Sequence, residues 1–123
     1  MTQNYPDLLK LKKSNINEEV VDPLMIFKTL LTPIFKRNNV LKAVVFGSTA
    51  RATRSKKSDL DLMIVMKSDK RFFDRYDDFH DIYDAIKGQS VDMLIYTPEE
   101  LDRISGRNFI QKILSEGKTI YEQ

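Results

Sequence analysis

Aspartate is depleted in β-strands, yet three aspartates of this chain lie in segments with strand patterns. Asp59 and Asp61 open the apolar segment 59–66, and Asp92 lies inside the apolar segment 91–96. Because side chains two residues apart in a strand point to the same face, we expect Asp59 and Asp61 side by side. If the two strands are neighbours, Asp92 joins them and three carboxylates converge.

Three carboxylates at such close range repel one another unless cations lie between them or their pKa values are raised. Two hard divalent ions about 3.5–4 Å apart suit such a cluster, and this arrangement supports in-line phosphoryl or nucleotidyl displacement. Asp59 alone, at the start of a strand, is also typical of a turn or cap. Asp61 and Asp92 have apolar neighbours on both sides, and buried acids need a partner.

The loop before the second strand supplies groups that suit phosphates. The strand-like segment 40–46 runs directly into Gly47-Ser48. Glycine lets the backbone approach a phosphate closely, and the serine hydroxyl and nearby N–H groups can donate to its oxygens. Arg51 lies in the same loop, whose further cations are Arg54, Lys56 and Lys57. Gly-Ser alone is typical of a turn, so the interpretation depends on the combination with the aspartates.

Composition limits the chemistry further. The 123 residues are enough for one domain, in which we expect residues 1–21 to be a lead-in segment and residues 22–123 the core. The chain has no cysteine and a single histidine, His80, so thiol chemistry, zinc–thiolate sites and multi-histidine metal sites are excluded. Any metal would be held by oxygen. The sequence has no apolar run of membrane-spanning length and no signal-peptide pattern, so we expect a cytoplasmic protein.

The elements that must position these residues can be read from the pattern. Asp22-Pro23 is typical of a helix start, and the apolar residues that follow recur at helical spacing. Pro33 is expected to kink or split this helix. The strands 40–46 and 59–66 are joined too closely for a helical crossover, so we expect them to pair antiparallel.

The second half of the chain alternates helices and strands. An amphipathic helix is expected over 69–87, ended by Gly88, with one apolar face made of Phe72, Tyr76, Phe79, Tyr83 and Ile86. A strand over 91–96, a capping box at 97–100, a last helix over 108–116 and a short edge strand at 119–121 follow. This order predicts an α+β fold with a small mixed sheet and helices packed against it.

Taken together, residues 45–51 (Val-Phe-Gly-Ser-Thr-Ala-Arg) and 58–62 (Ser-Asp-Leu-Asp-Leu) resemble the nucleotidyltransferases of the DNA polymerase β superfamily. The resemblance is closest to the short minimal nucleotidyltransferases (MNT) and covers about residues 23–122. It implies a nucleotidyltransferase fold, ATP or another nucleoside triphosphate as substrate, and two Mg²⁺ ions. The chain departs from the family pattern at Ala52, where a glycine often follows the arginine.

The resemblance also implies roles for individual residues. Gly47 and Ser48 would hold the β- and γ-phosphates, with Arg51 near them. Asp59 and Asp61 would ligate both metal ions. Asp92 would ligate one metal ion and help to deprotonate the acceptor hydroxyl.

Minimal nucleotidyltransferases are typically paired with a small helical toxin of the HEPN class. The resemblance therefore implies an antitoxin that transfers AMP from ATP to a tyrosine of such a partner. Two alternatives stay open: an antitoxin that neutralises its partner by steric cover alone, and nucleotidyl transfer to a small molecule. A homo-oligomer is also compatible with the short chain, whereas no pattern of interleaved aromatic and basic residues predicts nucleic-acid binding.

Overall fold

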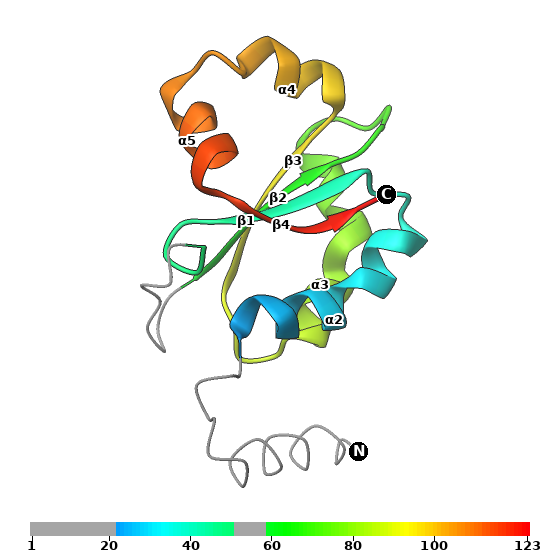
Figure 1. The fold of residues 1–123 in the computed structure, drawn as a ribbon. Helices are drawn as coiled ribbons and strands as arrows, with labels where there is room; N and C mark the ends of the chain where they lie inside the picture. The colour runs from blue at the N-terminus through cyan, green and yellow to red at the C-terminus, as the bar shows by residue number, and fades with distance from the viewer. Residues whose placement is uncertain (1–21, 51–58) are drawn as a thin grey trace, which may run out of the picture.

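The computed structural model describes residues 22–50 and 59–123, which form one four-stranded sheet with helices on both faces (Figure 1). The strands lie in the order β3-β2-β1-β4. Figure 1 shows α2 and α3 on one side of the sheet and α4 and α5 on the other. The elements in chain order are α2 (Pro23–Arg37), β1 (Lys42–Phe46), β2 (Leu60–Val65), the 3₁₀ helix η2 (Phe73–Phe79), α3 (His80–Ala85), β3 (Val91–Tyr96), α4 (Pro98–Ile104), α5 (Asn108–Glu116) and β4 (Lys118–Glu122).

The sheet is mixed, as the sequence predicts. β1 pairs antiparallel with both β2 and β4, whereas β2 and β3 run parallel. The expected antiparallel pairing of the strands on either side of the Gly47 loop is therefore confirmed, and so is the edge strand near the C-terminus. Because β2 and β3 are direct neighbours, the aspartates that they carry are brought onto adjacent strands.

Strand alternation divides the apolar residues into two cores. One face of the sheet packs against α2, η2 and α3. The core between them includes the fully buried residues Leu62 and Ile64 of β2 and Phe79 of η2. The other face packs against α5 through Met63 and Ile113. The side chains of Asp61, Met63 and Val65 in β2 therefore point toward α5.

The first helix, α2, is continuous across Pro33, so the expected split does not occur. Its start matches the sequence, since Asp22 caps it by accepting a hydrogen bond from the N–H of Leu24 at 3.0 Å. Apolar residues that the helix buries lie on both sides of Pro33, among them Leu31 and Ile34. Burial of this face outweighs the hydrogen bond that the proline ring removes.

The segment between β2 and β3 is not the single amphipathic helix that its spacing predicts. It forms η2 and then the short α3, with Gly88 at φ +86° shortly after the end of α3. Phe79 and Ile82 are buried as expected, but the side chain of Phe73 is 79% exposed. Tighter 3₁₀ winding brings residues three apart onto one face, and it accompanies an inward-pointing Arg75 that apolar periodicity does not reveal.

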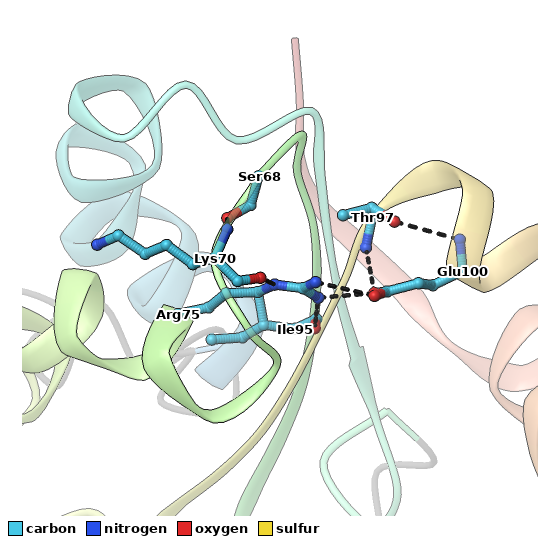
Figure 2. Close-up of polar contacts among 6 residues, drawn as sticks. All are labelled: Ser68, Lys70, Arg75, Ile95, Thr97 and Glu100. Carbon is cyan, nitrogen blue, oxygen red and sulfur yellow. Dashed lines mark hydrogen bonds and ion pairs between the residues drawn. The ribbon is translucent and has the colours of Figure 1, made fainter.

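Arg75 joins η2 to β3 and α4 (Figure 2). Its guanidinium donates to both carboxylate oxygens of Glu100, at 2.6 and 2.8 Å, and to the carbonyl oxygens of Lys70 and Ile95. Glu100 also accepts from the N–H of Thr97, which completes the expected capping box of α4. Chiefly because Arg75 donates to its carboxylate, the pKa of Glu100 is lowered to about 2.

Within residues 22–50 and 59–123, none of the helices combines the length and apolar content needed to cross a membrane.

Candidate active site

Asp61 and Asp92 lie side by side on neighbouring parallel strands. They are direct register partners of β2 and β3, so their Cα atoms are about 5 Å apart. Phe46, at the end of β1, is in turn the register partner of Asp61. Phe46, Asp61 and Asp92 thus form one row across three strands, on the face of the sheet that α5 covers.

This row borders a pocket of about 380 Å³. Gly47 and Leu94 line it from the sheet side, and α5 supplies the opposite wall. The pocket therefore combines two carboxylates with apolar walls, and its volume falls in the range of small-molecule sites. The described residues that line it are Phe46, Gly47, Asp61, Asp92, Leu94, Phe109, Lys112, Ile113 and Glu116.

Gly47 lies directly against the carboxylate of Asp61. Its φ is +75°, in the left-handed region that favours glycine, and a Cβ atom placed there would lie 2.2 Å from Oδ2 of Asp61. Two independent constraints, backbone conformation and space, therefore require glycine at this position. The glycine that the sequence suggests for phosphate binding also leaves room for the carboxylate.

The contribution of α5 to the pocket is not predicted from the sequence. Phe109, Lys112 and Glu116 recur at helical spacing, with one or two turns between them, and all three line the pocket. The ring of Phe109 packs edge-on against Phe46, with 6.0 Å between the ring centroids. The spacing alone could have indicated a shared face of the helix, but only the fold shows that this face meets the aspartates.

The other predicted site residues are placed differently. Asp59 is exposed directly before β2 and is not among the residues lining the pocket, and half-buried Ser48 is also absent from that lining. Arg51 falls outside the described residues. In the part of the chain that the structure describes, no group of three acidic or histidine side chains is close enough to hold a metal ion. A metal site with all three aspartates stays a prediction.

The pocket still has a donor set that suits a hard cation. Asp61 and Asp92 offer carboxylate oxygens from adjacent positions, and Mg²⁺ is commonly bound by one or two carboxylates together with substrate phosphates. A two-carboxylate site that is completed by a phosphorylated ligand therefore fits the residues present.

The family model for the polymerase beta nucleotidyltransferase domain matches residues 30–123, the segment that contains every element from the second half of α2 to β4. The chain belongs to this nucleotidyltransferase family. The family match confirms both the predicted superfamily and the fold, and the four-stranded mixed sheet is this family's scaffold in the present chain.

Solved structures with the same fold include toxin–antitoxin complexes. A toxin–antitoxin with AMP-PNP is 16% identical with a TM-score of 0.60, covering 78% of this chain and 73% of the other. A complex of tri-AMPylated HEPN toxin with MNT antitoxin from Shewanella oneidensis is 14% identical (TM-score 0.55; coverage 81% and 73%). A nucleotidyltransferase structure from Sulfolobus solfataricus is 21% identical (TM-score 0.55; coverage 81% and 80%). Among curated proteins, none matches this chain by sequence.

Proposed function

We propose that this nucleotidyltransferase transfers AMP from ATP to a tyrosine hydroxyl of a small helical HEPN-type partner and thereby acts as its antitoxin. The observation that carries the chemical part of this proposal is the pairing of Asp61 with Asp92 at one pocket beside Gly47. The family match supports nucleotidyl transfer as the reaction class.

The proposal assigns a role in the reaction to each predicted site residue. The backbone of Gly47 and the hydroxyl of Ser48 bind the β- and γ-phosphates, and Arg51 balances their charge. Asp59 and Asp61 supply oxygen ligands near the α-phosphate. Asp92 accepts the proton of the attacking hydroxyl, because its carboxylate lies next to Asp61 on the adjacent strand.

The acceptor oxygen forms a bond to the α-phosphorus, and the bond to the bridging oxygen of pyrophosphate breaks. When bound, Mg²⁺ would stabilise the negative charge on the attacking and leaving oxygens. The chain's own contribution is to hold the reactants in line and to exclude water through the apolar walls, which include Phe46 and Leu94.

The partner is proposed from two fold neighbours. One is a complex of tri-AMPylated HEPN toxin with MNT antitoxin, and the other is a toxin–antitoxin with AMP-PNP. The pocket's exposed Phe109, at 55% exposure, offers an apolar rim on which such a partner can rest its acceptor residue. We expect the isolated chain to transfer AMP slowly, because the acceptor must come from the partner.

The test combines this chain, ATP, Mg²⁺ and a HEPN-type partner, which is sought in the gene next to its own. Mass spectrometry of the partner is expected to show added AMP on a tyrosine, and EDTA is expected to prevent it. The double variant Asp59→Ala/Asp61→Ala is expected to give no addition. An unmodified partner under all conditions would contradict the proposal.

The same double variant separates catalysis from steric cover. If the partner is silenced by AMP addition, the variant loses neutralisation of the toxin in cells. If the variant still neutralises the toxin fully, the chain is a non-catalytic antitoxin. Addition of AMP to a small hydroxyl compound but not to the partner would favour the third reading, transfer to a small molecule.

A further inference from the structure

We propose that Lys112 is a phosphate-binding residue of the nucleotide site, reaching the phosphate chain of the donor from α5. This inference rests on the proposed function, since it assigns a second, opposite wall to the same nucleotide pocket. It adds a residue that lies far from the Gly47 loop and the strand aspartates in the sequence.

The position of Lys112 on α5 directs it to the pocket. Its neighbour Ile113 is 2% exposed and is packed in the core against β1 and β2, which fixes the rotation of the helix. Phe109 and Glu116, one turn to either side, line the pocket together with Lys112. Lys112 itself is exposed as well as lining the pocket, so its side chain is not confined by packing.

Lys112 is the charged group of the described pocket lining that can attract a phosphate. The other charged side chains of that lining are the carboxylates of Asp61, Asp92 and Glu116, and Lys112 is its only cation. The carbonyl oxygen of Lys112 accepts a hydrogen bond from the hydroxyl of Ser115, but within residues 22–50 and 59–123 the Lys112 ammonium forms neither a hydrogen bond nor an ion pair. The ammonium is therefore available to a ligand and is not held by a structural partner.

The ligand chemistry follows from the other side of the pocket. Gly47 brings backbone to the same cavity, and Asp61 and Asp92 are the residues that would hold a divalent cation. A compact ammonium opposite these groups suits phosphate oxygens, which accept charge-assisted hydrogen bonds from lysine. Phe46 and Phe109 leave an apolar wall for the uncharged part of the nucleotide.

The test compares the full-length wild-type chain with Lys112→Gln, Lys112→Arg and the control Lys87→Gln. Lys87 is exposed just after α3, which packs on the opposite face of the sheet. Calorimetric titrations with Mg²⁺ use three probes: ATP, inorganic tripolyphosphate and adenosine. Circular dichroism and thermal melting show whether each variant is folded.

We expect Lys112→Gln to weaken ATP and tripolyphosphate binding about tenfold, because one charge-assisted contact is lost. Binding of adenosine is expected to stay within about twofold, and Lys112→Arg is expected to recover most of the loss because it keeps the charge. Lys87→Gln is expected to match the wild type.

Equal affinity of wild type and Lys112→Gln for ATP would overturn the inference and leave the proposed function intact. An equal loss for adenosine and ATP would also overturn it, because Lys112 would then act on the shape of the pocket. A wild-type chain that binds neither ATP nor tripolyphosphate would instead contradict the proposed function itself.

Discussion

At the scale of single residues, Gly47 and Asp61 constrain each other through close contact. The carboxylate oxygen of Asp61 occupies the space that any side chain at position 47 would need. The backbone of Gly47 is left-handed directly after β1, and Gly47 lines the same pocket as Asp61 and Asp92. Glycine is thus needed at position 47 for the backbone conformation and for the position of the Asp61 carboxylate.

Gly47→Ala is expected to abolish nucleotidyl transfer and to lower the free energy of unfolding by about 1–3 kcal/mol, from left-handed strain plus the collision with Asp61. Gly88→Ala is the matched control, because Gly88 has φ +86° but nothing within 4 Å of an added Cβ. Gly88→Ala is expected to lower the free energy of unfolding by about 1 kcal/mol through backbone strain, while nucleotidyl transfer stays normal. Urea unfolding and a transfer assay measure both quantities.

The comparison of the two glycine variants isolates the contact. If Gly47→Ala transfers AMP as fast as Gly88→Ala, the proximity of Gly47 to Asp61 has no catalytic meaning. If both variants lose activity equally, a general loss of stability explains the effect.

At the scale of elements, the ion pair between Arg75 and Glu100, called the clamp below, joins parts of the chain that are distant in sequence. Arg75 is 4% exposed and ties η2 to the start of α4, while also donating to a carbonyl of β3 (Figure 2). A buried guanidinium that loses its carboxylate is left without charge compensation. The clamp therefore fixes how α4 leaves the sheet.

Glu100→Gln is expected to lower the free energy of unfolding at pH 7 by about 2 kcal/mol. The folded pKa of Glu100, about 2, lies below its ordinary value of 4.5. The clamp's contribution is thus fully present above about pH 4.5 and is lost as the pH falls toward 2. The difference between wild type and variant should shrink over this range, as measured by urea unfolding at a series of pH values. A difference that is constant from pH 7 to 3 would contradict this account.

Elements with purely local signals are predicted well from the sequence. The bounds of β3 and α5 match the structure, because an apolar segment marks the strand and Gly117 marks the end of the helix. The winding of 69–87 and the continuity of α2 across Pro33 are not predicted, because they depend on tertiary contacts. The burial of Arg75 is a contact of this kind, since its partners lie 5 to 25 residues away along the chain.

At the scale of the whole molecule, the larger core and the pocket lie on opposite faces of the sheet. Figure 1 shows α2 and α3 on one side of the sheet and α5 on the other. The face toward α2 and α3 holds the larger apolar core, while on the face toward α5 the row of Phe46, Asp61 and Asp92 lies beside a pocket. The aspartates of this row are predictable from the sequence, because acids are unusual in strands. The lining from α5 is not, because it depends on how the helix crosses the sheet.

The central claim is nucleotidyl transfer from this pocket, and the most direct measurement uses ATP labelled at either the α- or the γ-phosphate. With the HEPN-type partner and Mg²⁺, we expect label from the α-phosphate alone on the partner. Asp61→Asn and Asp92→Asn are expected to reduce transfer at least about 100-fold, and the exposed Asp84→Asn is expected to leave it unchanged. Transfer of the γ-label, or α-label transfer that survives both Asn substitutions, would contradict the account.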